Sequence, residues 1–78
     1  MPSIKHIAGP YRFYFYSFDC NEPQHVHVPR EHRTCKYWLK PLELAANHGF
    51  TPRELNRIRA EVARNMLIIL EAWHEHCG

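Results

Sequence analysis

The sequence of 78 residues has little net charge, no long apolar run and no internal repeat. Ten lysines and arginines against eight aspartates and glutamates leave a formal charge of +2, too little to indicate nucleic-acid binding without a local basic cluster. No stretch approaches the roughly 18 apolar residues of a membrane span, and the opening MPSIKHIAGP lacks the apolar centre of a signal peptide. We therefore expect a cytoplasmic protein that does not act at a membrane.

Cysteines are also few. Cys20, Cys35 and Cys77 are odd in number and share no CxxC spacing, which argues against a disulfide framework and favours a reducing compartment. No arrangement of Cys with His and Asx marks a nucleophile, so the sequence indicates core or turn positions for Cys20 and Cys35.

The length allows one small domain, residues 1–78, with a single core. Hydrophobic residues make up 45% and charged residues 23%, the balance of a globular chain. A chain this short buries only about 60% of its unfolded surface. We therefore expect marginal stability, or help from a partner, a metal or self-association.

Aromatic and β-branched residues dominate the first half and predict three strands. Residues 11–18, YRFYFYSF, predict the first, which turn residues end. Residues 24–28 alternate polar and β-branched positions, as a half-buried strand does, and residues 34–39 form a third run. Because the last two runs lie close in sequence, we expect an antiparallel hairpin with Glu31 and His32 at its turn.

The second half of the chain has helical patterns. Residues 41–48 predict a short amphipathic helix that begins with Pro41 and ends before Gly49. A capping box follows, in which the Thr51 hydroxyl accepts the backbone N–H of Glu54 while the Glu54 carboxylate reaches back.

One long C-terminal helix should begin at this box, because apolar residues recur every three or four positions from Leu55 to Trp73. The predicted fold class is α+β: a three-stranded antiparallel sheet packed on a short helix and one long C-terminal helix. Part of the long helix is apolar on every side, which a small sheet cannot cover. We expect a cognate small protein or self-association to cover Met66, Leu67, Ile68 and Leu70.

The hairpin register separates side chains into two faces. The first should pack on the long helix and carries Val26, Val28, Cys35, Tyr37 and Leu39, with Phe13 and Phe15 from the first strand. The second carries His25, His27, Lys36 and Trp38, with Arg12, Tyr14 and Tyr16 beside them.

The second face gathers imidazoles, cations and aromatic rings in a chain that has seven histidines. His25, His27 and Lys36 are candidate catalytic residues, because a nearby lysine disfavours imidazolium and prepares a histidine for general-base work. Phosphate contact and base stacking would fall to Arg12, Tyr14, Tyr16 and Trp38. This set suits a metal-independent ribonuclease or an RNA-binding protein without a cofactor. An inert His/aromatic face that packs on a partner is the plainer interpretation.

The histidine pair allows a second chemical interpretation. His25 and His27 project to one side of a strand, ~6 to 7 Å apart, as at the start of many zinc sites. Candidate third ligands are Asp19, Cys20, His32, His74 and Cys77. Because this set has no fixed spacing, we assign no metal from the sequence. His74 and His76 also suit a helix end, where they complement the dipole.

Arginines recur on the outer side of the predicted long helix, where Arg53, Arg57 and Arg64 could contact phosphates. Spacings of i, i+3 pair Arg57 with Glu54 and Arg64 with Glu61, and so favour an ordinary ion-paired helix face.

The segments GPYRFYFYS at 9–17, EPQHVHV at 22–28 and CKYWL at 35–39 resemble DUF4160, a widespread family of small bacterial domains of unknown function. The resemblance continues through residues 49–58 and 70–75 and so covers essentially the whole chain. The family's central signature is Pro-Pro-His-Φ-His, where Φ is apolar. PQHVH at 23–27 matches it, except that Gln24 replaces the second proline and loosens the turn.

This resemblance implies a compact α+β protein, often encoded beside another small protein, as in toxin–antitoxin pairs. It implies no established activity, because fold-level analogy does not choose a function. The functional expectation is a protein-interaction or RNA-associated component of a two-gene system, with a metal-independent ribonuclease as the enzyme hypothesis. The alternative is a non-catalytic, His-ligated metal-binding protein.

Overall fold

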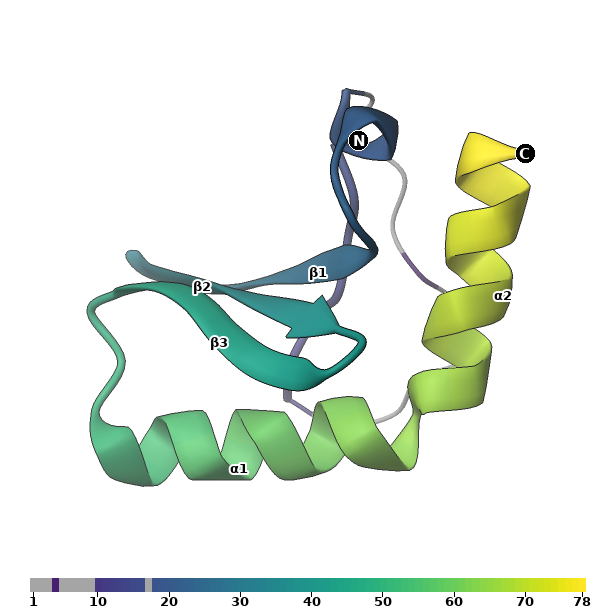
Figure 1. Cartoon of the computed structure of the whole chain (residues 1–78). Coiled ribbons are helices and arrows are strands. Elements are labelled where there is room, and N and C mark those ends of the chain that lie inside the picture. Colours follow the sequence, from purple (N-terminus) through teal and green to yellow (C-terminus); the bar gives the residue numbers. More distant parts are fainter. Residues whose placement is uncertain (1–3, 5–9, 17) are drawn as a thin grey trace.

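The computed structural model describes residues 4, 10–16 and 18–78. Its elements, in chain order, are the 3-10 helix η1 (Asp19–Asn21), β1 (His25–Arg30), β2 (Arg33–Leu39), β3 (Leu42–His48), α1 (Pro52–Arg64) and α2 (Met66–Cys77). The strands form one antiparallel sheet in the order β1-β2-β3. α1 runs along the sheet, and α2 then turns away to stand beside the end of the sheet (Figure 1). The α+β class with a three-stranded antiparallel sheet is confirmed.

The β1–β2 hairpin has the register that the alternation of its residues predicts. Its opposed pairs include His25 with Trp38, Val26 with Tyr37, His27 with Lys36, and Val28 with Cys35. The predicted core face is also confirmed, since the buried side chains include Phe13, Phe15, Val26, Val28, Cys35, Tyr37 and Leu39. The helices complete this core with Ile58, Val62, Ile69 and Trp73.

The prediction of a strand over residues 11–18 is wrong for the part of it that the structure describes, which leaves out residue 17. Among the described residues of this segment, only Tyr14 forms a bridge, in which Tyr14 and His27 exchange two backbone hydrogen bonds of 3.1 Å. The alternation of the segment still places Tyr11, Phe13 and Phe15 in the core. A period of two therefore identified the buried face, although it did not establish a continuous ladder with β1.

The prediction of a helix over residues 41–48 is wrong, because Leu42–His48 is strand β3. β2 otherwise presents an unpaired edge, and pairing with β3 satisfies its backbone groups. This long-range pairing outweighs the local helix propensity of Leu, Glu and Ala. Gly49 does adopt a positive φ of 106°, but it follows a strand.

The predicted long helix is divided into α1 and α2 at Asn65, whose side chain donates to the Glu61 carbonyl at 2.8 Å. The predicted N-cap is confirmed, since Thr51 Oγ1 accepts from the Glu54 N–H at 3.2 Å. Turning at Asn65 lets α2 bury Ile69 and Trp73 against the core, which one straight helix could not do. Neither helix is both long and apolar enough to cross a membrane.

The core covers more of the apolar segment at residues 66–70 than the sequence predicts. Met66 and Leu70 pack against the core, while Leu67 is 77% exposed. Association with a partner or a second copy through this segment stays a prediction.

Replacing Gly49 by alanine should destabilise the fold by about 1 to 2 kcal/mol. A Cβ there would meet Arg33 Cγ at 2.8 Å, and the φ of 106° disfavours any L side chain. Gly78→Ala is the matched control, because Gly78 also has a positive φ but a Cβ there meets nothing within 4 Å. Urea unfolding of both variants checks the prediction, and equal midpoints would contradict it.

Candidate functional site

A buried carboxylate stands where the aromatic segment meets β1. Asp19 is 1% exposed, and its Oδ2 accepts the backbone N–H of Tyr16 at 2.7 Å. The Asp19 N–H in turn donates to the Tyr16 carbonyl at 3.1 Å. This reciprocal turn fixes the carboxylate before any other residue contacts it.

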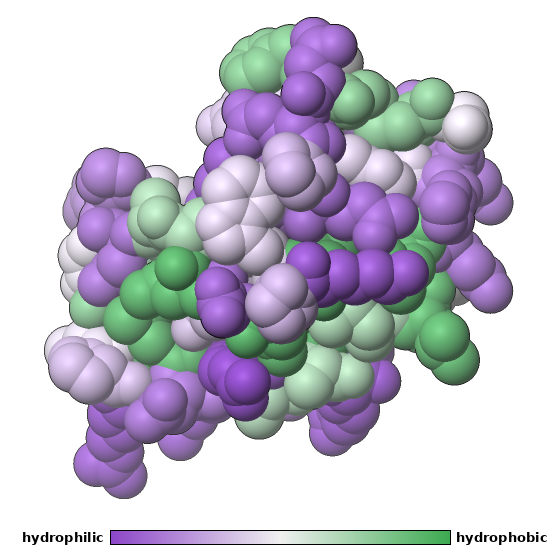
Figure 2. All heavy atoms as spheres, viewed as in Figure 1, coloured by the Kyte–Doolittle hydropathy of each residue, from purple (hydrophilic) through white to green (hydrophobic). Residues whose placement is uncertain are grey.

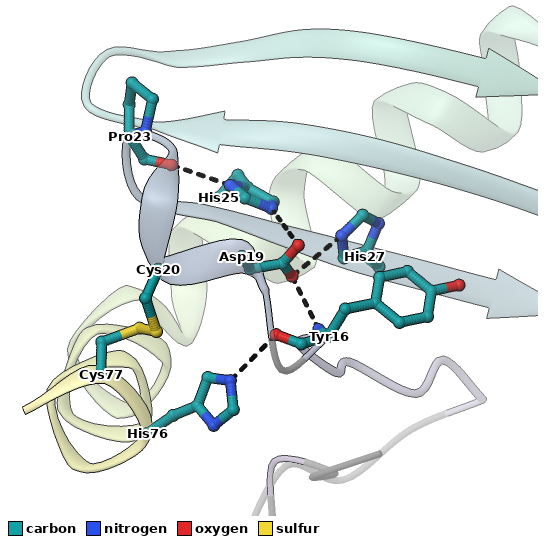
Figure 3. The surroundings of a disulfide bond; sticks show 8 residues. All are labelled: Tyr16, Asp19, Cys20, Pro23, His25, His27, His76 and Cys77. Carbon is teal, nitrogen blue, oxygen red and sulfur yellow. Dashed lines mark hydrogen bonds and ion pairs between the residues drawn. A yellow bond between two sulfur atoms is a disulfide. The ribbon is translucent and has the colours of Figure 1, made fainter.

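Both histidines of β1 point at this carboxylate (Figure 3). His25 Nε2 lies 3.1 Å from Asp19 Oδ1, and His27 Nε2 lies 3.1 Å from Asp19 Oδ2. Because the histidines are two positions apart on a strand, they share one side of it, and their ring centroids lie 5.0 Å apart. We call Asp19, His25 and His27 the Asp-His cluster.

The hydrogen bonding of His25 fixes where its proton lies. His25 Nδ1 is 2.8 Å from the Pro23 carbonyl, which can only accept, so Nδ1 carries the hydrogen. Nε2 is then the other nitrogen, and it is buried without a hydrogen-bond partner among the described residues. Its 3.1 Å distance to Asp19 Oδ1 suits an ion pair, but the direction is not that of a hydrogen bond. The second ring nitrogen of His25 thus faces the Asp19 carboxylate inside the Asp-His cluster.

Burial and charge set the protonation of the other two members. Burial alone raises the pKa of Asp19, but the Tyr16 N–H and the two histidines outweigh it and hold that pKa below its usual value. Burial also lowers the pKa of His27, and nearby His25 and Lys36 add to the effect against the opposing Asp19 charge. His27 is therefore neutral at pH 7 and donates its Nε2–H to Asp19 Oδ2.

Aromatic rings surround the Asp-His cluster. Tyr14 stacks on His27 with ring centroids 5.4 Å apart, and its hydroxyl lies 2.8 Å from that of Tyr16. Burial and this contact raise the pKa of Tyr14 to about 12. The His25 ring lies edge-on to Trp38 at 5.5 Å and to Trp73 at 5.3 Å. These rings exclude water and strengthen electrostatic interactions in the cluster.

The structure brings together most of the residues predicted for the second face, with two differences. Lys36 lies over the Trp38 ring at 4.4 Å, but its Nζ is bound to Glu22 Oε1 at 2.6 Å. Arg12 is exposed and lines a different hollow with Arg30, at the far end of β1 from His25. The structure therefore does not place Arg12 with the histidines.

The sequence places His25 on the face away from the C-terminal helix, and this is wrong, because Trp73 of α2 packs against its ring and its side chain is fully buried. The turn at Asn65 brings Trp73 against the His25 ring, which no spacing in the sequence indicates. His27 retains 15% side-chain exposure and is the accessible member of the pair. The sequence offers Asp19 as one of several possible third metal ligands. Its position in the turn before β1 is the feature that indicates it.

The expectation against disulfides is also wrong, because Cys20 and Cys77 form a disulfide. It joins Cys20 of η1, the residue after Asp19, to the end of α2 (Figure 3). His76 lies close to both sulfurs and its Nε2 is 2.9 Å from the Tyr16 carbonyl. With the sulfurs bonded to each other, this second cluster offers no thiolate ligands. Cys35 is free and buried. Burial raises the pKa of its thiol to about 12, so the reactive thiolate does not form near neutral pH.

Acidification should destabilise the fold through His27. The pKa of His27 in the folded state lies below the ordinary 6.5. As the pH drops below 6.5, the unfolded chain therefore binds a proton before the folded one does, and the free energy of unfolding falls. In His27→Gln, the free energy of unfolding should decline less steeply from neutrality to about pH 5. Chemical unfolding at several pH values measures this slope. His48→Gln, at an exposed position, is the control, and identical slopes in both variants would contradict the assignment.

Comparison with known proteins gives a family and no established activity. The model of a family described as "Domain of unknown function (DUF4160)" matches residues 11–74, which include the Asp-His cluster, and it confirms the resemblance read from the sequence. No curated protein and no solved structure matches the chain significantly. Because the match covers most of the chain, this protein belongs to the DUF4160 family.

Proposed function

We propose that this DUF4160 protein binds a divalent transition metal, with Zn²⁺ the best fit, through Asp19, His25 and His27. The observation that carries the proposal is the buried Nε2 of His25, which has no hydrogen-bond partner among the described residues. A buried nitrogen without a hydrogen bond loses its hydration and recovers at most the attraction of a nearby charge, here Asp19 at 3.1 Å. A cation bonded to that nitrogen would remove this penalty.

The spacing of the donor atoms supports a metal. Zn²⁺ binds imidazole nitrogen and carboxylate oxygen at about 2.0 to 2.2 Å, so neighbouring ligand atoms lie roughly 3.0 to 3.5 Å apart. Both nitrogen-to-oxygen distances in the Asp-His cluster are 3.1 Å. The three ligand atoms also lie within 4.8 Å of one another. Little movement is then needed to bind the ion.

The hydrogen bond that His25 makes through its other ring nitrogen is the kind that metal-ligating histidines make. A ligating imidazole usually donates its other N–H to a carbonyl or carboxylate, which fixes the tautomer. His25 does this through Nδ1 and the Pro23 carbonyl, at 2.8 Å. Two imidazoles and one carboxylate suit Zn²⁺ better than Mg²⁺ or Ca²⁺, which prefer oxygen ligands.

The ribonuclease hypothesis for His25, His27 and Lys36 stays a prediction, as do a role in a two-gene system and contact with RNA. Burial makes it the weaker candidate. A general acid or base must come within hydrogen-bonding reach of its substrate, and His25 is 0% exposed. Lys36 is also engaged by Glu22. These facts favour metal binding, because a buried histidine can hold an ion without contacting a substrate.

Zinc titration of untagged, chelator-treated, oxidised protein should show one equivalent bound. His27→Gln and Asp19→Asn should each weaken binding by about tenfold to a hundredfold or more, since metal ligands are affected at least as strongly as their supporting residues. Zinc should also raise the melting temperature, because it binds the folded state alone. Calorimetry and elemental analysis measure the two quantities, and Mg²⁺ should give neither effect.

His74→Ala is the matched control, because His74 is an exposed histidine outside both clusters. The Cys20→Ser/Cys77→Ser double variant tests whether zinc instead binds beside His76, and it should retain the bound equivalent. Less than about a tenth of an equivalent in the wild-type protein, or equal binding by His27→Gln and wild type, would end the proposal.

A further inference from the structure

A second group of charged residues lies at the other end of β1 from His25. The β1–β2 turn and the first two turns of α1 border an open hollow of about 380 Å³. Its lining residues are Arg30, Arg33, Thr51, Arg53, Glu54 and Arg57. Four arginines and one glutamate therefore line it, and we call this the arginine hollow. Its volume falls within the range of small-molecule sites.

Glu54 binds the two arginines of the sheet and not Arg57. Its Oε1 accepts from Arg33 at 2.9 Å, and its Oε2 accepts from Arg30 at 3.3 Å and from the Tyr11 hydroxyl at 3.3 Å. The expected pairing of Glu54 with Arg57 is therefore wrong, whereas Arg64 does pair with Glu61 at 3.0 Å. The arginines of the sheet compete better for Glu54, because they approach it from a fixed surface.

The sheet arginines are held in place before any ligand arrives. The Arg30 guanidinium lies over the Tyr11 ring at 5.3 Å, and that of Arg33 lies over the Phe50 ring at 5.5 Å. Stacking restricts both side chains, yet each remains about a third exposed, 35% and 32%. A guanidinium has five N–H donors, so several on each arginine stay available.

The two helix arginines supply positive charge that no described residue neutralises. Arg53 and Arg57 are exposed and form no ion pair with any residue that the structure describes. Figure 2 shows hydrophilic side chains projecting along the lower edge of the molecule, where Figure 1 places α1. The hollow therefore combines two arginines held by carboxylates with two that pair with no described residue. Glu31 also pairs with Arg33, at 3.5 Å, so four arginines are set against two carboxylates and the excess charge is positive.

We propose that the arginine hollow binds the phosphate group of a small phosphorylated ligand, such as a nucleotide with a terminal phosphate. Arginine forks match phosphate oxygens in pairs of charge-assisted hydrogen bonds. The basic residues converge on one hollow, and the whole chain carries only +2. A concentrated positive charge suits a compact dianion better than the single charges spread along a nucleic-acid backbone. This site is separate from the proposed metal site and does not depend on it.

The test compares ligands that differ only in phosphate. Adenosine 5′-monophosphate and pyrophosphate should shift the backbone amide NMR signals around Thr51 and Arg33, and adenosine should not. A short RNA with a 5′-phosphate should bind more tightly than the same RNA with a 5′-hydroxyl. Equal binding of adenosine and its monophosphate, or no binding of any phosphate, would overturn the proposal. Equal binding of the two RNAs, both tighter than the mononucleotide, would assign the hollow to the RNA backbone instead.

Variants on exposed positions keep the test independent of folding. Arg53→Gln and Arg57→Gln should each weaken binding of the monophosphate by roughly tenfold, the usual loss for a charge-assisted hydrogen bond. Arg64→Gln is the matched control, because Arg64 lies on the same helix but pairs with Glu61 outside the hollow. An equal loss in Arg64→Gln would show that general charge, and not the hollow, attracts the ligand.

Discussion

The buried carboxylate of Asp19 is the group on which the arrangement of the site depends. Moving an unpaired carboxylate out of water costs on the order of several kcal/mol, so its contacts must return that energy. The Tyr16 N–H and the two histidines of β1 are those contacts. They join the aromatic segment, η1 and β1 at one point. Because His25 Nε2 has no hydrogen bond with any residue that the structure describes, the cation that we propose would satisfy a buried polar group at this point.

The turn between α1 and α2 places Trp73 against the Asp-His cluster. If residues 52–77 formed one straight helix, Trp73 would project beyond the sheet. With the turn at Asn65, Trp73 packs against Phe15 at 5.2 Å and His25 at 5.3 Å. The Cys20–Cys77 disulfide then fastens the end of α2 to η1, beside Asp19. Because it joins cysteines 57 positions apart in sequence, this bond restricts the unfolded chain and stabilises the fold.

Local patterns predicted the parts of the molecule that depend on neighbours in sequence. The alternation of residues 24–28 predicted the β1–β2 register, and Thr51 predicted the start of α1. Contacts between distant segments decided the rest. Residues 42–48 have helix-forming side chains, but the free edge of β2 makes them a strand. The two-face pattern placed both histidines together, yet only the path of α2 determines that His25 is sealed.

The position of Asp19 shows the same limit at the candidate site. An aspartate in a turn is usually explained by turn geometry alone, and nothing nearby in sequence indicates that it would be 1% exposed. Glu54 is a parallel case, since its place in a capping box predicted a local role. It instead holds Arg30 and Arg33 across a gap of more than twenty residues. Both carboxylates bind residues that lie too far away in sequence for a local pattern to indicate the contact.

Anomalous diffraction from crystals of the oxidised protein grown with zinc shows whether the Asp-His cluster binds the ion. We expect one strong peak at the zinc absorption edge, about 2 Å from Nε2 of His25 and of His27 and bonded to Asp19. A map without that peak at saturating zinc, in which His25 Nε2 donates a straight hydrogen bond to Asp19, would contradict this expectation.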